Sequence, residues 1–235
     1  LPHLKSAVLC EPFYNKSVVI DLSADFRLKD QKTFEAAYGA PVPNPGLLKK
    51  AVYGLSEWHY TAIKTADIIA NPGCYPTVSL LPLLPVAKEG LISGTCIINA
   101  ISGISGAGKK LKEYLLFCER TENMCAHSPG QTHRHTPEIQ QEIHLVNENI
   151  DVLFTPHLAP LKRGMVATMT VPLTQQGLTA DIRDIYESYY GNCTFVDLKN
   201  EIPRSRDVWG TNRCDIFWCV EGNILMLFSA IDNLI

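Results

Sequence analysis

The chain has 235 residues, which is compatible with one large domain or two smaller ones and is enough to bury a core without disulfide staples. Acidic and basic residues are intermixed and the formal charge is −3, so there is no basic stripe for nucleic acid and no polybasic membrane anchor. No apolar run approaches the ~20 residues that span a bilayer, and the scattered cysteines lack C-x-x-C spacing, which predicts a cytoplasmic protein with reduced thiols.

The first part of the chain has the pattern of the end of an α/β domain. Two short buried strands are predicted, at residues 17–23 and 66–70. Between them, residues 31–37 predict a helix that Gly39 ends.

After this part the pattern changes toward a mixed sheet. Strands are predicted at residues 95–100, 152–155, 166–173, 194–198, 215–220 and 224–230. Helices are predicted at 110–120, at 137–146 with Thr136 as its cap, and at 180–190 between Thr179 and Gly191. Several strands follow one another without helices, and 166–173 alternates between apolar and polar residues. We therefore expect an α+β arrangement with helices on one face of the sheet.

Cys74 lies between a predicted strand and a predicted helix, in the segment NPGCYPT at 71–77. Pro76 suits the first helical position, which places Cys74 just outside the helix near unpaired N–H groups that favour a thiolate. Such a thiolate is a nucleophile. The alternative is a tight turn whose cysteine fills a small apolar hole. Pro82 is expected to kink or end this helix after about two turns.

A second candidate is the segment HRHTPE at 133–138, which places two histidines before a helix and Glu138 in its first turn. A histidine can exchange a proton near neutral pH, and a carboxylate can select its tautomer. Three other interpretations remain. The histidines can be surface loop residues, Glu138 can merely complement the helix dipole, or His133 and His135 can bind a metal.

Two further kinds of loop carry candidate binding groups. The glycine-rich segment SGISGAGKK at 102–110 follows a strand and can present N–H groups to a phosphate, although it matches neither a Walker A nor a G-x-G-x-x-G motif and can be only a flexible connection. Arg27 and Arg163 follow strands and can clamp a carboxylate or phosphate, or can be solvated surface charges.

Together these segments resemble the N-acetyl-gamma-glutamyl-phosphate reductase family, a relative of aspartate-semialdehyde dehydrogenase. The resemblance is spread over most of the chain and depends on the order of seven segments: DLSADFR at 21–27, YGLSE at 53–57, NPGCYPT at 71–77, SGISGAG at 102–108, HRHTPE at 133–138, FTPH at 154–157 and AIDNL at 230–234.

The resemblance implies an enzyme of arginine biosynthesis that reduces a small acyl phosphate, N-acetyl-L-glutamyl 5-phosphate, to the semialdehyde with NADPH and without a metal. It implies that Cys74 forms a thioester, that His133 is the acid/base and that Glu138 orients it. Arg27 and Arg163 would hold the phosphate or the substrate carboxylate. The residues expected to approach NADP(H) are Ser102, Gly103, Ser105, Gly106, Ala107, Gly108 and Asn233.

The resemblance also implies a domain organisation. Residues 1–71 would be part of a Rossmann-type NADP-binding domain, and residues 72–235 an α+β catalytic and dimerisation domain of a homodimer or homotetramer. The family's G-x-x-G-x-x-G loop and its C-terminal helix have no counterpart here, so we expect a chain truncated at both ends. Three alternatives remain: an aspartate-semialdehyde dehydrogenase, a non-catalytic fragment or paralogue that serves as an assembly module, and a metal-dependent hydrolase that uses His133 and His135.

Overall fold

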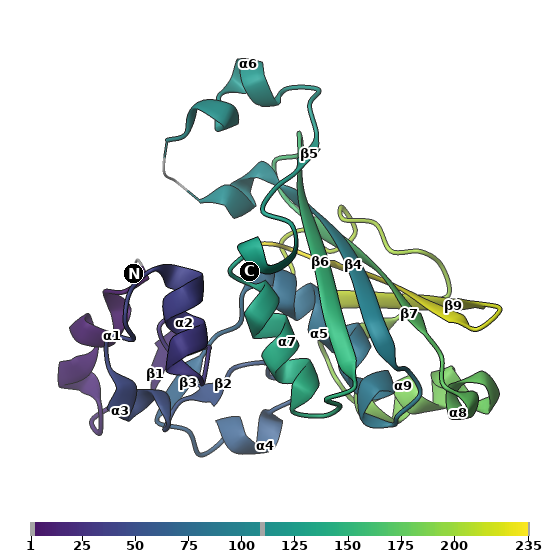
Figure 1. The fold of residues 1–235 in the computed structure, drawn as a ribbon, viewed down its shortest axis with the longest axis horizontal. Helices are drawn as coiled ribbons and strands as arrows, with labels where there is room; N and C mark the ends of the chain where they lie inside the picture. The colour runs from purple at the N-terminus through teal and green to yellow at the C-terminus, as the bar shows by residue number, and fades with distance from the viewer. Residues whose placement is uncertain (1–2, 109–110, 235) are drawn as a thin grey trace. The chain divides into compact units, whose positions relative to one another are not determined.

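The computed structural model describes residues 3–108 and 111–234 and has an α/β fold (Figure 1). The chain divides into two compact units, Leu1–Thr77 and Val78–Ile235. The first contains a small parallel sheet and the second a mixed sheet of seven strands, which confirms the predicted fold class. The functional boundary expected after residue 71 stays a prediction.

The first unit is built on a three-stranded parallel sheet. Its strands β1 (Val19–Asp21), β3 (Ile68–Ala70) and β2 (Val52–Tyr53) lie in the order β1-β3-β2. The helical segments of this unit are α1 (Ser6–Leu9), η1 (Glu11–Phe13), α2 (Gln31–Tyr38), α3 (Pro45–Leu48) and α4 (Tyr60–Ile63). Side chains from the strands and helices pack into one apolar core that includes Phe26, Phe34 and Ile68.

Helix α2 shows how local sequence defines an element of this unit. The Asp30 carboxylate accepts the Thr33 N–H at 2.8 Å and caps the helix start. Gly39 has φ of 68° and ends the helix in the left-handed conformation. The predicted helix is therefore confirmed, and it extends one residue further, to Tyr38.

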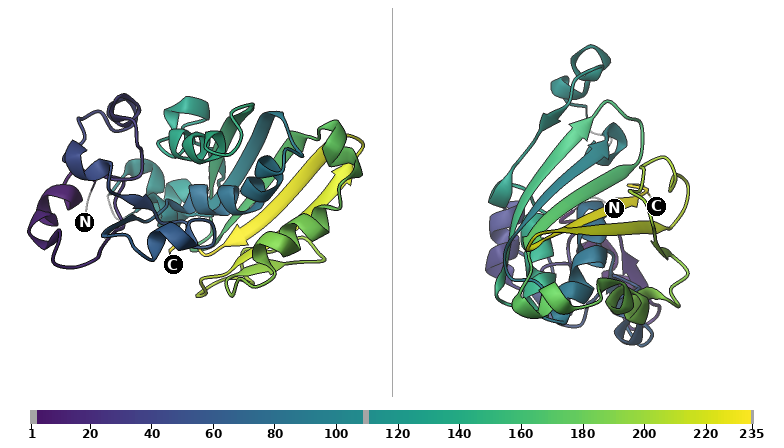
Figure 2. Two further views of the ribbon diagram at one scale, coloured as in Figure 1. Left: turned by 90° about the horizontal axis from the view of Figure 1, so that it is seen from below. Right: turned by 90° about the vertical axis from the view of Figure 1, so that its right-hand side faces the viewer.

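The second unit contains the seven-stranded sheet, with strand order β5-β6-β4-β7-β10-β9-β8 (Figures 1 and 2). The strands are β4 (Gly94–Gly103), β5 (Cys125–Ala126), β6 (Ile150–Ala159), β7 (Met165–Pro172), β8 (Val196–Leu198), β9 (Cys214–Glu221) and β10 (Ile224–Ile231). Only the pairs β4–β6 and β8–β9 are parallel. The six predicted strands are confirmed, and β5 is an additional short one.

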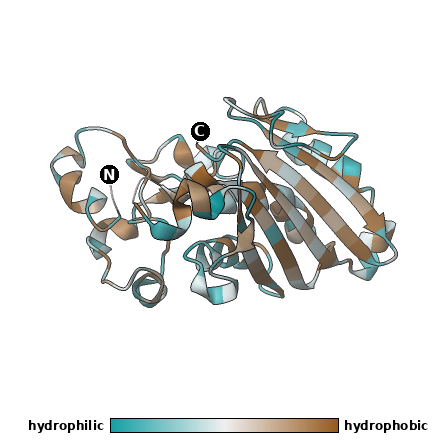
Figure 3. Cartoon of the chain, turned by 90° about the horizontal axis from the view of Figure 1, so that it is seen from above, coloured by the Kyte–Doolittle hydropathy of each residue, from teal (hydrophilic) through white to brown (hydrophobic). Residues whose placement is uncertain are grey.

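The sheet of the second unit has one buried face and one more exposed face. Along β4, Cys96, Ile98 and Ala100 are fully buried, whereas Ile97 between them is 42 % exposed. The same alternation runs through β7, and bands of contrasting hydropathy cross the strands in Figure 3. Because successive side chains of a strand point to opposite faces, the alternation defines which face is the core.

Helix α5 (Cys74–Lys88) continues through Pro82 and Pro85, so the expected end at Pro82 is wrong, whereas a kink there stays a prediction. A proline supplies no N–H to the carbonyl four residues earlier, which here leaves the Val78 and Leu81 carbonyls. Ser229 Oγ donates to the Val78 carbonyl at 2.6 Å, and the Tyr190 hydroxyl donates to the Leu81 carbonyl at 2.6 Å. Hydroxyl groups from β10 and α9 thus replace both missing helical donors.

The remaining helical segments correct several predicted boundaries. They are η2 (Ile104–Ala107), η3 (Glu113–Leu115), α6 (Phe117–Arg120), η4 (Gly130–Thr132), α7 (Thr136–His144), α8 (Gln175–Thr179) and α9 (Ile182–Tyr190). Within residues 111–120 there are two short turns instead of the predicted helix, and Lys110 lies outside the described residues.

Two of the predicted caps are also wrong. Thr136 is the first helical residue of α7 and its hydroxyl donates to the Gly130 carbonyl at 2.6 Å. Asp181, not Thr179, caps α9, because Thr179 is the last residue of α8. Gly191 does follow α9 as its C-terminal cap, as predicted.

Candidate active site

Cys74 is the first residue of α5, because the Thr77 N–H closes the first turn on the Gly73 carbonyl at 3.0 Å. The predicted start at Pro76 is therefore two residues late. The thiol is still at the positive end of the helix, among the first-turn N–H groups, and it is partly exposed. By contrast, Cys96 is fully buried, and burial raises the pKa of its thiol to about 12. Only the first of these environments favours a thiolate.

The backbone that leads to Cys74 passes close to Gly54. A Cβ on Gly54 would lie 2.9 Å from Ile69 Cγ2 and 3.1 Å from Asn71 Cα, so only glycine fits there. The Asn71 N–H donates to the Asp21 carbonyl at 2.9 Å. Strand ends β1 and β3 thus hold the start of the cysteine loop within the first unit.

Arg27 lies in the same unit and is only 5 % exposed. Its Nη2 donates to the Leu22 carbonyl at 3.1 Å, across the loop that follows β1. Asp21, at the end of β1, accepts the hydroxyls of Ser6 and Ser23. The structure therefore gives Arg27 a loop-bracing contact, and its role as a substrate clamp stays a prediction.

His133 lies between η4 and α7 in the second unit. Its Nδ1 accepts the backbone N–H of His135 at 3.1 Å, so the neutral ring carries its proton on Nε2. The ring packs against Phe154 and His127, with centroids 5.3 Å and 5.6 Å away. Backbone and aromatic contacts thus define both the tautomer and the ring orientation.

The electrostatic surroundings keep His133 neutral. Burial, followed by the nearby His135, His127 and Arg134, lowers the pKa of His133 to about 3. The pKa of His127 is also lowered, first by burial and then by His157 and basic neighbours. At neutral pH the His133 ring is therefore neutral, and its Nε2–H is the group that can give up a proton and take it back, as an acid/base does.

Glu138 is fully buried in the first turn of α7. A carboxylate there is stabilised by the helix dipole whatever else it contacts. The contact described on His133 Nδ1 comes from His135, so an orienting role for Glu138 stays a prediction.

The glycine-rich loop forms the 3₁₀ turn η2 and is fastened to neighbouring segments. The N–H groups of Ile104 and Ser105 donate to the carbonyls of Leu161 and Lys162, at 2.8 Å and 3.3 Å. A Cβ on Gly106 would lie 2.6 Å from Ser102 Oγ, on the inner side of the turn, while Gly106 itself is exposed. Two of the loop's N–H groups are therefore already engaged, and Gly106 and Gly108 are its exposed positions.

Asn233 connects this loop to the end of the chain. Its Oδ1 accepts the Gly164 N–H at 2.7 Å and its Nδ2 donates to Ser105 Oγ at 3.0 Å. Of the other predicted loop residues, Ser102 and Gly103 are buried, whereas Ala107 and Gly108 are at least partly exposed. Lys109 and Lys110 lie outside the described residues.

Arg163 belongs to the turn between β6 and β7 and forms an ion pair with Asp232. Its Nε lies 2.6 Å from Asp232 Oδ2, and its side chain is 33 % exposed while that of Asp232 is fully buried. Arg163 is thus a cation that is held by Asp232 and remains partly exposed, as an arginine that binds an anionic group must be.

Sequence reasoning missed His127 and Asp232. His127 has no motif of its own, and the pairing of β5 with β6 brings it to His133. Asp232 is part of the AIDNL segment, which signalled a family likeness without indicating a partner for Arg163.

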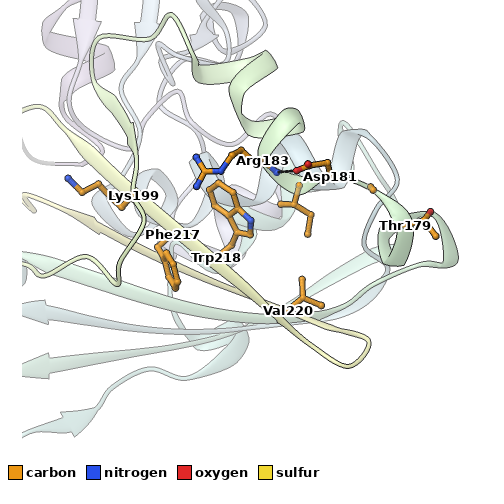
Figure 4. Close-up of a pocket in the computed structure, with 9 residues that line it drawn as sticks. Thr179, Asp181, Arg183, Lys199, Phe217, Trp218 and Val220 are labelled. Atoms are coloured by element: carbon orange, nitrogen blue, oxygen red, sulfur yellow. Dashed lines mark hydrogen bonds between the residues drawn. The ribbon is translucent and has the colours of Figure 1, made fainter.

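Other features of the surface do not involve these residues. A groove of about 510 Å³ near the start of α9 is lined by Arg183, Lys199 and Trp218 among others, with Arg183 over the Trp218 ring (Figure 4).

Within residues 3–108 and 111–234, no cluster of three or more His, Cys, Asp or Glu side chains is arranged to hold a metal ion. Among the same residues, no helix has the length and apolar character needed to cross a membrane.

A family match defines the class of the protein, and its fold agrees. Residues 74–233 match the family described as semialdehyde dehydrogenase, dimerisation domain. The fold resembles the crystal structure of aspartate semialdehyde dehydrogenase II from Vibrio cholerae with a TM-score of 0.70 and 17 % identity, over 98 % of this chain and 72 % of that one. The class is that of the semialdehyde dehydrogenases, which are oxidoreductases that use a nicotinamide cofactor.

Closer relatives identify the family within this class. N-acetyl-gamma-glutamyl-phosphate reductase from Lachnoclostridium phytofermentans is 43 % identical over 98 % of this chain and 68 % of its own length. The enzyme of that name from Geobacter sulfurreducens is 44 % identical over 100 % of this chain and 70 % of its own length. The chain belongs to the N-acetyl-gamma-glutamyl-phosphate reductase family.

Proposed function

We propose that the protein catalyses NADPH-dependent reduction of N-acetyl-L-glutamyl 5-phosphate to N-acetyl-L-glutamate 5-semialdehyde, through a thioester on Cys74. The observation that carries this proposal is a partly exposed cysteine at the first position of a helix, in a chain more than 40 % identical to reductases of that name. Arginine biosynthesis in the cytoplasm is the setting that the resemblance implies.

The chain's own groups account for bond making and breaking. The Cys74 thiolate attacks the C5 carbonyl carbon, a C–S bond forms, and the C–O bond to phosphate breaks as phosphate leaves. NADPH, when bound, supplies the hydride that reduces the thioester. The Nε2–H of His133 donates its proton to the oxyanion of the resulting thiohemiacetal and takes it back while the carbonyl re-forms and the C–S bond breaks, which releases the semialdehyde and regenerates the thiolate.

The remaining candidates hold the reactants in this proposal. NADP(H) binds beside the glycine-rich loop, and Asn233 secures that loop. The loop residues in this role are Ser102, Gly103, Ser105, Gly106, Ala107 and Gly108. Arg163 and Arg27 bind the phosphate or the substrate carboxylate. Glu138 supports His133 from the first turn of α7.

The cysteine role is tested with Cys74→Ser in the complete gene product. Phosphate-dependent oxidation of the semialdehyde should fall by at least about 10³-fold, because a serine hydroxyl is a far weaker nucleophile at this pH. Cys118→Ser, which changes an exposed cysteine on α6 outside the large sheet, is the matched control and should retain activity. Robust turnover by Cys74→Ser would refute the thioester.

Substrate identity is tested by comparing N-acetylglutamate semialdehyde with aspartate semialdehyde. The proposal requires a higher kcat/KM for the first compound. A preference for the second would assign the protein to the aspartate enzymes instead. No turnover of either, together with no micromolar binding of NADP, would favour the assembly-module alternative.

We also propose that the exposed face of the large sheet forms a homodimer, from which a homotetramer can be built. Register places Leu153, Ile97, Thr170 and Met226 in one row across β6, β4, β7 and β10. Ile97 and Leu153 are 42 % and 49 % exposed, and Phe217 and Phe228 pack together in the next row. An apolar surface of this kind on a domain described as a dimerisation domain is suited to a second copy.

The dimer is tested with Ile97→Asp, which places a charge in the middle of that face. The expected result is dissociation in analytical ultracentrifugation. Ile202→Asp changes an isoleucine that is 58 % exposed outside the sheet, and it should leave the mass unchanged. An unaltered mass for Ile97→Asp would exclude this face.

A further inference from the structure

Asp232 has a fully buried carboxylate that accepts two backbone N–H groups and forms an ion pair with Arg163. Oδ2 accepts the Gly210 N–H at 2.7 Å and contacts Arg163 Nε, and Oδ1 accepts the Leu234 N–H at 2.9 Å. Burial by itself raises the pKa of Asp232, but Arg163 and the two backbone donors outweigh it, so the pKa lies below its usual value. The group is therefore a buried anion at neutral pH.

The backbone donors alone do not require a charge. A neutral acceptor would satisfy the Gly210 and Leu234 N–H groups at a lower desolvation cost than a carboxylate. Of the three described partners of Asp232, only the Arg163 cation is stabilised more by a carboxylate than by a neutral acceptor. The acid at this position is thus matched to Arg163.

The backbone beside Arg163 is held independently of its side chain. The Gly103 N–H donates to the Gly164 carbonyl at 2.9 Å, and Asn233 accepts the Gly164 N–H. A Cβ on Gly103 would lie 2.7 Å from the backbone nitrogen of Arg163, so the two loops are in close contact. These contacts place the Arg163 backbone beside the proposed cofactor loop. The contact with Asp232 then determines only the direction of the Arg163 side chain.

The contact on Asp232 is made through Nε, which is buried. The exposed part of the Arg163 side chain therefore lies on its other atoms, where the two terminal nitrogens can form a fork for an anion. We propose that Asp232 is a positioning residue, which holds Arg163 by Nε so that its terminal nitrogens bind an anionic group of the substrate. This inference rests on the proposed function.

The oxidative reaction provides a selective test, because the two anionic groups are then on separate substrates, inorganic phosphate and the semialdehyde carboxylate. In the complete gene product, Asp232→Asn should raise the KM for one of the two about tenfold, with a smaller change in kcat and in the KM for NADP. The KM that rises identifies the group that Arg163 binds. A merely structural role would instead lower kcat or stability without this selectivity, and that outcome would overturn the inference.

Two further variants complete the test. Arg163→Gln should raise the same KM, and adding Asp232→Asn to it should change that KM by less than about twofold, because the two residues act through one contact. An unchanged KM in Arg163→Gln would overturn the inference even where Asp232→Asn does not fold. Asp207→Asn, in the exposed pair of Arg204 and Asp207 at 3.0 Å, is the matched control and should leave each KM unchanged.

The outcome for the wild-type protein separates the two levels of the proposal. A wild-type protein without turnover would overturn the proposed function and this inference with it. If the wild-type protein is active and Asp232→Asn has the same KM values as the wild type, this inference alone would be overturned.

Discussion

The hydroxyl of Ser229 donates a 2.6 Å hydrogen bond to the carbonyl of Val78, the acceptor that Pro82 leaves without its helical donor. The two residues are 151 positions apart in the sequence. Strand β10 therefore completes a helix that its own sequence cannot complete.

Ser229→Ala should destabilise the protein by about 1–3 kcal/mol, because it leaves a buried carbonyl without a donor. The midpoint of urea unfolding measures the change. Ser79→Ala is the matched control on the same helix: Ser79 Oγ is buried and has no hydrogen-bond partner among the described residues, so its removal should be neutral or slightly stabilising. Equal losses from both variants would contradict the role of Ser229.

Tyr190→Phe should produce a loss of similar size, about 1–3 kcal/mol, because the ring remains and only the donor to the Leu81 carbonyl is removed. Thermal unfolding followed by circular dichroism is a suitable measurement. Tyr60→Phe, at a tyrosine that is 62 % exposed, should leave the unfolding temperature unchanged. A Tyr190→Phe protein as stable as wild type would show that α5 tolerates Pro85 without help.

Gly164→Ala should cost more than Gly222→Ala. Both glycines have positive φ, 96° and 59°, so both variants introduce backbone strain of about 1–2 kcal/mol. At Gly164 the new Cβ would also lie 2.5 Å from Trp209 Nε1, whereas nothing lies within 4 Å at Gly222. Overpacking adds about 1–3 kcal/mol at the first site only, which urea unfolding can resolve. Equal costs would mean that the Trp209 side chain moves away freely.

The low pKa of His133, about 3, predicts a pH dependence of stability. Below pH ~6.5 the histidine of the unfolded chain binds a proton, whereas His133 in the folded protein stays neutral. Stability should therefore fall as the pH drops below about 6.5, and this loss should level off only near the folded pKa. His133→Asn should reduce the slope of unfolding free energy against pH between about 7 and 5. An unchanged slope in His133→Asn would contradict this assignment.

Cys74 should be alkylated by iodoacetamide at neutral pH faster than Cys118, although Cys118 is the more exposed of the two. A thiol at the start of a helix has a larger thiolate fraction, and the thiolate is the species that reacts. Cys96, buried and with a pKa of about 12, should remain unmodified. Peptide mapping by mass spectrometry measures the three rates, and a slower Cys74 would argue against its activation.

Local sequence determined much of this protein. The Asp30 cap and the Gly39 terminator define α2 within a few residues, and the alternation along β7 identifies its buried face. The order of the short motifs around Cys74 and His133 indicated the family, which the relatives confirm. These features depend on backbone preferences and on side chains close together in the sequence, so they can be read from the sequence itself.

Only the tertiary structure decided what depends on distant partners. Pro82 is tolerated because Ser229 donates to the Val78 carbonyl, and His127 reaches His133 because β5 pairs with β6. Arg163 is held because Asp232, directly after β10, pairs with it. Each of these contacts follows from strand register and helix packing. Sheet pairing brings such residues together from far apart along the chain, and no local pattern records the pairing.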